Sequence, residues 1–445
     1  MHTTKRTRPL GLIAGASALA LVLTACGLGD PGDSAPEPQD LDDAEIAGTI
    51  TFQTMQLSPT FDDLINGYIE EFEDMHPEVT VNWVDVPTDG TAQKINADAA
   101  SGNLADVLNL DSGHLTPLAR EGRVLDMSAM VPEAQDDYLE SAWEVFAIGG
   151  PEISALPWYL NTPVLVVNTT IMEEAGLDEI PRTYFDMMDA SAVIGEETEY
   201  AGFQLGASIF KNALLATGTP IVNDDATEAV INTPEAQDLV ERLHALYLNG
   251  GIPADSITAE PRSGLEVLSE GRVAFGSGGP NQLRIVDENA PDLLAQLEVH
   301  PPIVDENDEA WLVAHGLAVP TTSENQATAI EFARFVTNSD NQLLLANESV
   351  VFPSTPDALN QPFFTEAEDD LVDQGRAIAA QNLLDERVAP QSDDVDREIE
   401  GELWSQMQLA LMGDEEISIA LERTERRSPR SFKDALSDDC LQVCS

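Results

Sequence analysis

The most constraining feature of this sequence is an alternation of strand-like and helix-like segments between residues 49 and 110. Strand patterns cover 49–52, 79–83 and 105–110, with helical spacing of apolar residues between them. Strands separated by a helix run parallel, because the helix carries the chain back along the sheet. This order of elements therefore predicts an α/β fold with a parallel sheet and helices packed on it.

The ends of these helices carry local signals. Ser58-Pro59 predicts a helix start, with the hydroxyl as N-cap and the proline at the first helical position. His76-Pro77 predicts the end of that helix, and residues 87–90 predict a turn. Gly102 predicts the end of the second helix.

Further along, residues 153–168 form two extended stretches on either side of Pro163. Because proline fixes φ and lacks an N–H, a bend or a crossing is expected there. A strand over 311–319 and a helix over 325–337 follow, and the remainder is largely helical. We expect three tryptophans to lie in the core, at positions 83, 143 and 404.

Length and charge limit the function. A chain of 445 residues with 43% hydrophobic residues is expected to form two or more lobes. Against 80 acidic residues there are only 21 Lys and Arg, a net charge of −59, which excludes nucleic-acid binding by repulsion of phosphates. No lysine follows a glycine, so no phosphate-binding Walker loop is present.

The N-terminus has the pattern of an export signal. Lys5, Arg6 and Arg8 precede an apolar run from Leu10 to Leu23 that is too short for a membrane-spanning helix. The run ends in Leu-Thr-Ala-Cys26, which resembles the bacterial lipoprotein signal. The resemblance implies that residues 1–25 are removed and that a lipid on Cys26 anchors the protein to the outer face of the cytoplasmic membrane. The alternative is an ordinary export signal with a chance cysteine.

The remaining cysteines, Cys440 and Cys444, form either a terminal disulfide or two free thiols. The six histidines have no His or Cys partner at zinc-ligand spacing, so we expect no metal and no cofactor.

Several stretches together resemble the extracellular solute-binding proteins of ABC importers, in the carbohydrate-binding group that includes maltose-binding protein. They are Glu71–Pro77, Ala105–Leu110, Leu156–Pro163, Ala318–Pro320, Ala329–Val336 and Asn341-Gln342. The resemblance implies two discontinuous α/β lobes, strand crossovers and a central ligand cleft that closes. It implies a monomeric receptor that is not an enzyme, binds a sugar, and delivers it to the permease subunits of an ABC transporter.

Carried onto this sequence, the family architecture divides the chain at three crossings. These fall near residues 162–164, 309–312 and 353–356. The expected division is a signal peptide at 1–25, a flexible tether at 26–47, an N-terminal lobe at 48–161 and 311–354, a C-terminal lobe at 165–308 and 355–425, and a polar tail at 426–445.

Candidate ligand residues are those that follow predicted strands or lie at the crossings, because ligands of α/β sheets bind at the carboxyl ends of strands. They are Gln56, Ser58, Asp89, Asp111, Trp158, Tyr159, Asn161, Gly279, Pro280, Trp311 and Ser354. We expect Trp158 to stack on a sugar ring, with Tyr159 pointing the opposite way along an extended strand.

Two other functions remain open. A glycoside hydrolase would need two carboxylates across a cleft, and the 80 acidic residues of this chain could supply such a pair. A receptor for a cationic or other non-sugar solute is equally compatible with the acidity.

The lipoprotein signal gives a direct prediction. Cys26→Ser removes the thiol that would accept the lipid, so the variant should either stay unprocessed or appear in the soluble fraction. Membrane fractionation of cells that produce both forms measures this. A processed variant that remains in the membranes like the parent would contradict lipidation at Cys26.

Overall fold

The computed structural model describes residues 44–427 apart from 222, 224–228, 259–261, 306, 350, 368–369 and 391–396. The export signal, Cys26, most of the predicted tether, Cys440 and Cys444 therefore lie outside the described residues. Among the described helices, none has the length and apolar character needed to cross a membrane.

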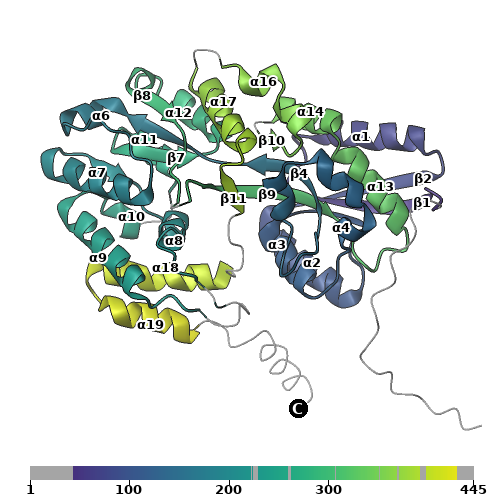
Figure 1. Ribbon diagram of the computed structural model, residues 1–445, viewed down its shortest axis with the longest axis horizontal. Coiled ribbons are helices and arrows are strands. Elements are labelled where there is room, and N and C mark those ends of the chain that lie inside the picture. The colour runs from purple at the N-terminus through teal and green to yellow at the C-terminus, as the bar shows by residue number, and fades with distance from the viewer. Residues whose placement is uncertain are drawn as a thin grey trace, which may run out of the picture. The chain divides into compact units, whose positions relative to one another are not determined.

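The first sheet has seven strands in the order β10-β4-β9-β3-β1-β2, with β11 paired to β9 (Figure 1). β1, β2 and β3 are parallel, as predicted, whereas β9 is antiparallel to both β3 and β4. The strands are β1 (Gly48–Met55), β2 (Val79–Val86), β3 (Val107–Asp111), β4 (Leu156–Asn161), β9 (Ala310–Ala318), β10 (Phe352–Pro353) and β11 (Val388–Pro390).

The second sheet has four strands in the order β6-β7-β5-β8. β5 is antiparallel to β7 and β8, and β6 is parallel to β7. The strands are β5 (Val164–Asn168), β6 (Ala201–Phe203), β7 (Val273–Gly278) and β8 (Leu297–His300). The chain thus leaves the first sheet at Asn161 and enters the second at Val164, on either side of Pro163, where a bend or a crossing is predicted.

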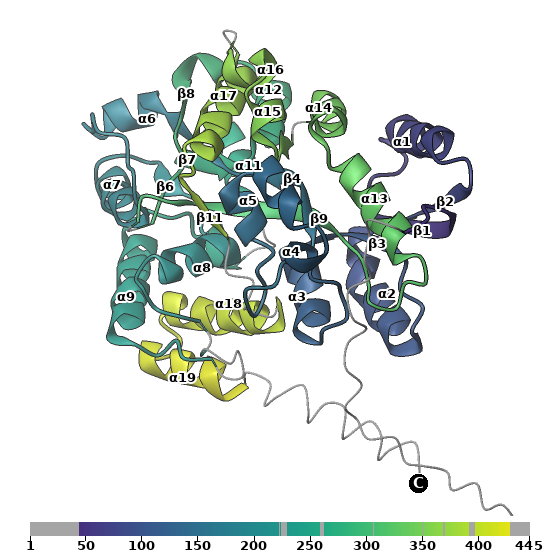
Figure 2. The same cartoon turned by 45° about the vertical axis from the view of Figure 1, so that its right-hand side comes forward.

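Helices connect and cover the strands. In both views α13 and α14 lie beside α1, and α18 and α19 lie beside α9 (Figures 1 and 2). The helices are α1 (Asp62–Met75), α2 (Thr88–Ser101), α3 (Ser112–Arg120), α4 (Met127–Met130), α5 (Glu140–Glu144), α6 (Thr169–Glu174), α7 (Tyr184–Glu197), α8 (Ala207–Leu215), α9 (Pro234–Asn249), α10 (Asp255–Thr258), α11 (Gly264–Ser269), α12 (Leu283–Asn289), α13 (Gln326–Val336), α14 (Ser339–Glu348), α15 (Pro356–Leu359), α16 (Pro362–Thr365), α17 (Leu371–Leu384), α18 (Arg397–Met412) and α19 (Ile417–Arg427).

Two of the predicted helix boundaries are wrong. α1 begins at Asp62 with Phe61 as its N-cap, so Ser58 does not cap it; the Ser58-Pro59 peptide bond is cis. The predicted turn at 87–90 is instead the start of α2, which begins at Thr88 directly after Pro87. The end of α2 is confirmed, because Gly102 adopts the left-handed conformation (φ 69°) and closes the helix.

Two apolar clusters form the core. The larger lies around the first sheet, includes Trp143, and continues onto residues of β5, β7 and β8 in the second sheet, while the smaller lies around α7, α9 and α18. Trp143 is buried as predicted, whereas Trp83 and Trp404 are only partly buried and pack against the clusters.

The contact between α7 and β6 is close enough to exclude a side chain. A Cβ built on Gly202 of β6 would lie 1.8 Å from Ser191 Oγ and 2.8 Å from Ser191 Cα. The helix therefore rests directly on the strand backbone at this point.

This packing predicts that Gly202→Ala lowers the free energy of unfolding by about 1–3 kcal/mol through overpacking. The matched control is Gly67→Ala in α1, where nothing lies within 4 Å of the new methyl group. That substitution should stabilise the protein by about 0.5–1 kcal/mol through helix propensity. Chemical denaturation measures both, and equal midpoints for the two variants would contradict the steric account.

Candidate functional site

A row of three polar or aromatic side chains crosses the first sheet. Asp111 is the last residue of β3 and pairs with His315 of β9, which in turn pairs with Tyr159 of β4. Asp111 lies at the edge where the parallel strands β1, β2 and β3 all end, which is where α/β sheets bind ligands. All three side chains are half-buried, so they reach the surface. We call Asp111, His315 and Tyr159 the platform row.

The rings of Tyr159 and His315 are stacked, with 4.5 Å between centroids and 15° between planes. Burial lowers the pKa of His315 to about 4, although the neighbouring Asp111 carboxylate opposes this effect. Burial also raises the pKa of Tyr159. Both rings are therefore uncharged at pH 7 and offer a flat, neutral surface.

Asp111 is held in place by α3. Its carboxylate accepts a hydrogen bond from the backbone N–H of His114 at 2.8 Å and pairs with the His114 Nδ1 atom at 2.8 Å. Burial alone would raise the pKa of Asp111, but the His114 hydrogen bond and the positive charges that His114 and His315 carry when protonated lower it to about 2. Asp111 is therefore an ionised acceptor at pH 7.

Trp158 does not lie where it could stack on a bound sugar. It is fully buried, with its ring 6.1 Å from that of Phe52 and 5.2 Å from that of Tyr159. The pairing of β4 with β9 shifts register between Pro157 and Tyr159, so the regular alternation of side chains fails at Trp158. Neighbouring rings that should have pointed apart instead touch, which contradicts the expectation that Trp158 stacks on a sugar while Tyr159 points away.

Three other candidates lie near the same edge of the sheet. Gln56 and Ser58 are exposed on the loop after β1, and Asp89 is exposed in the first turn of α2. The Gln56 Oε1 atom accepts a hydrogen bond of 2.8 Å from the Thr88 hydroxyl, which ties the loop after β1 to the start of α2. These three residues stay predictions as ligand contacts.

The crossings contain the remaining first-sheet candidates. Asn161 and Trp311 are half-buried at the ends of β4 and β9, and the Thr162 hydroxyl donates a hydrogen bond to the Trp311 carbonyl. Ser354 is fully buried, and its hydroxyl donates to the Pro157 carbonyl at 2.9 Å. Its burial gives Ser354 a structural role rather than a ligand-facing one.

Gly279 and Pro280, at the carboxyl end of β7, are buried as well. The Gly279 N–H donates to the side chain of Gln282, and Gly375 of α17 packs against the Pro280 ring. This tight loop thus packs against α17, and Gly279 and Pro280 stay predictions as ligand contacts.

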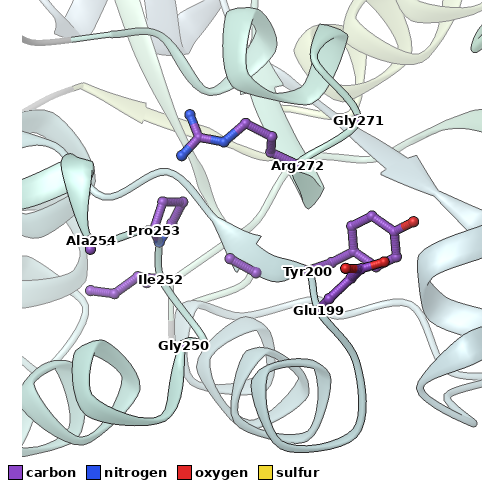
Figure 3. A pocket seen from close by; sticks show the side chains of 9 residues that line it. Glu199, Tyr200, Gly250, Ile252, Pro253, Ala254, Gly271 and Arg272 are labelled. Atoms are coloured by element: carbon purple, nitrogen blue, oxygen red, sulfur yellow. The ribbon is translucent and has the colours of Figure 1, made fainter.

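A surface pocket of about 360 Å³ lies at the amino ends of β6 and β7, opposite their carboxyl ends (Figure 3). The Arg272 side chain beside it makes a two-bond ion pair with Asp255, at 2.8 and 2.9 Å, and a further pair with Glu270. Its charge is compensated within the protein. The pocket is lined by Glu199, Tyr200, Ala201, Gly250, Ile252, Pro253, Ala254, Gly271 and Arg272.

Two residues of the candidate site were not predicted from the sequence, namely His114 and His315. His114 was identifiable, because it lies three residues after Asp111 at a helix start. His315 was not, because its role depends on strands distant in sequence. In the described part of the chain, no group of three His, Cys, Asp or Glu side chains is arranged to hold a metal ion.

The fold and the position of the site are those of a binding protein with two sheets and chain crossings between them. The chain belongs to the bacterial extracellular solute-binding protein family, whose model matches residues 58–343. This confirms the family and the two-lobed periplasmic-binding-protein fold that the sequence resembles.

Individual relatives agree with this assignment. The diacetylchitobiose binding protein DasA of Streptomyces coelicolor is 24% identical over 356 residues, covering 78% of this chain and 82% of DasA. A Synechococcus sp. MITs9220 protein assigned to the oligosaccharide periplasmic-binding proteins has a TM-score of 0.74 at 26% identity, covering 86% of this chain and 98% of its own. The sugar-binding protein MalE of Xanthomonas citri shares the fold, with a TM-score of 0.70 at 17% identity over 86% of this chain and 96% of its own.

The lowered pKa of His315 predicts a pH dependence of stability. The unfolded chain binds a proton at the ordinary histidine pKa near 6.5, whereas the folded site resists protonation until about pH 4. The contribution of His315 is therefore complete above pH 6.5 and is lost as the pH falls towards 4, by at most about 1.4 kcal/mol per pH unit.

Chemical denaturation of the parent and of His315→Gln at several pH values between 4 and 7 measures this contribution. It appears as a difference between the two proteins in the slope of the free energy of unfolding against pH. The variant should lose less stability on acidification than the parent, whatever its stability at pH 7. Parallel curves for the two proteins would contradict a His315 ring that stays neutral in the folded protein down to about pH 4.

Proposed function

We propose that this protein is the sugar receptor of an ABC importer, and that it binds an oligosaccharide on the platform row. The supporting observation is the half-buried Tyr159–His315 stack beside the ionised Asp111 carboxylate, at the ligand-binding edge of a solute-binding fold. Stacked neutral rings suit the apolar face of a pyranose, and a carboxylate accepts hydrogen bonds from its hydroxyl groups.

The relatives support a carbohydrate ligand. By its name, DasA binds diacetylchitobiose, and the Synechococcus structure is assigned to the oligosaccharide-binding proteins. On this proposal the protein is a monomer, is not an enzyme, and hands its sugar to the permease subunits of the transporter. The low pKa of Asp111 is the opposite of what the general acid of a glycosidase needs, so Asp111 does not suit that role.

We further propose that the two sheets are the cores of two lobes. The first lobe comprises 48–161 and 311–354, and the second comprises 165–308 and 355–425, except that β11 at 388–390 pairs with β9 and so belongs to the first sheet. The sheet membership of β4 and β5 on either side of Pro163 supports a hinge at this crossing. Closure of the lobes around the sugar would then cover the platform row. The lipid on Cys26 would hold the receptor at the outer face of the cytoplasmic membrane.

A thermal-unfolding screen with maltose, maltotriose and diacetylchitobiose tests the proposed function. A sugar at 100 times its dissociation constant should stabilise the native protein by about 2.7 kcal/mol. Tyr159→Ala should abolish most of this gain, whereas Tyr159→Phe, which keeps the ring, should retain most of it.

Two controls separate binding from folding. Trp158→Ala should lower stability by about 3–5 kcal/mol with or without sugar, because it empties a core position. Trp404→Ala should also destabilise both states equally, since Trp404 packs on the second cluster. Full binding by Tyr159→Ala would contradict the platform.

A further inference from the structure

Asp85, near the end of β2, is bonded to the loop that follows β1. Its Oδ1 atom accepts hydrogen bonds from the Thr54 hydroxyl at 2.6 Å and from the Leu57 N–H at 3.0 Å. Its Oδ2 atom accepts a third, from the Ser58 N–H at 3.2 Å. One half-buried carboxylate thus holds three donors on a neighbouring strand and loop.

This carboxylate belongs to a longer network of hydrogen bonds that begins at Trp83, which packs against the larger apolar cluster. The Trp83 indole N–H donates to the Thr54 hydroxyl at 2.8 Å, and that hydroxyl donates in turn to Asp85. The loop between Thr54 and Leu57, which Asp85 bonds at both ends, includes Gln56. The φ of Gln56 is 55°, a left-handed conformation that non-glycine residues seldom adopt. The loop conformation therefore depends on bonds from outside the loop.

The network also lies close to the platform row. The negative charge of Asp85, like that of Asp111, contributes to the raised pKa of Tyr159, an effect that is due mainly to burial. The loop that Asp85 holds follows β1, which pairs in parallel with β3, so the exposed Gln56 and Ser58 lie at the same edge of the sheet as Asp111. Asp85 itself is occupied by internal donors, so its role differs from that of a residue that contacts ligand.

We propose that Asp85 is a positioning residue of the sugar site, which holds the loop at residues 56–58 in its binding conformation before the sugar arrives. This inference rests on the proposed function. A loop that is already ordered loses less conformational entropy on binding, so the same contacts give a higher affinity. Loss of one acceptor oxygen would leave a loop N–H without its partner and would allow the loop to open.

The test compares Asp85→Asn with Asp63→Asn in the full chain. Both substitutions remove one negative charge, but Asp63 is exposed in the first turn of α1 and lies outside the network. The first readout is amide hydrogen exchange of Leu57 and Ser58 without sugar. Asp85→Asn should speed this exchange about tenfold or more while the β1 amides stay protected, and Asp63→Asn should not.

The second readout is the affinity for maltotriose and for diacetylchitobiose. Asp85→Asn should weaken binding about tenfold or more, and Asp63→Asn should bind like the parent. Slow exchange at Leu57 and Ser58 in Asp85→Asn, or unchanged affinity despite fast exchange, would overturn the inference. If the parent binds neither sugar, the proposed function fails for these sugars, and the exchange rates alone decide whether Asp85 holds the loop.

A measurement on the parent protein covers the case in which Asp85→Asn does not fold. Nuclear magnetic resonance of selectively labelled protein measures the scalar couplings across the hydrogen bonds between the Leu57 and Ser58 amides and the Asp85 carboxyl carbon. Both couplings should be present, because the carboxylate accepts a hydrogen bond from each amide. Amides that show no coupling to the Asp85 carboxyl carbon would overturn the inference.

Discussion

The insertion of β9 between β3 and β4 is the interaction on which the site depends. β9 returns to the first sheet after the chain has built the second, and it pairs antiparallel with both neighbours. This pairing brings together Asp111, His315 and Tyr159, which are about 50 and 150 residues apart in sequence. A strand that slipped by one residue would turn His315 to the other face and remove the ring stack.

The local parts of this architecture are readable from the sequence. The alternation of strand-like and helix-like residue patterns between 49 and 110 predicts the parallel strands β1, β2 and β3. Gly102, with its positive φ, ends α2 where the sequence predicts it. Pro163 marks the crossing between sheets. Each of these features depends on residues close together in the chain.

The features that the sequence does not reveal depend on distant contacts. Nothing near His315 indicates which strands will flank it. The register shift at Trp158 arises from the pairing of β4 with β9, and one extra residue was enough to bury the ring predicted to bind sugar. Ser58 followed by Pro59 has the pattern of a helix start, but the Asp85 carboxylate binds the Ser58 N–H and the helix begins later.

The proposed binding mode places a sugar ring on the Tyr159–His315 stack. A crystal structure of the protein grown with the sugar that stabilises it most tests this directly. We expect a pyranose ring against Tyr159, with a hydroxyl group in hydrogen-bonding distance of Asp111 and the loop at residues 56–58 unchanged. Sugar bound elsewhere, for instance in the pocket beside Arg272, with the platform row empty, would contradict it.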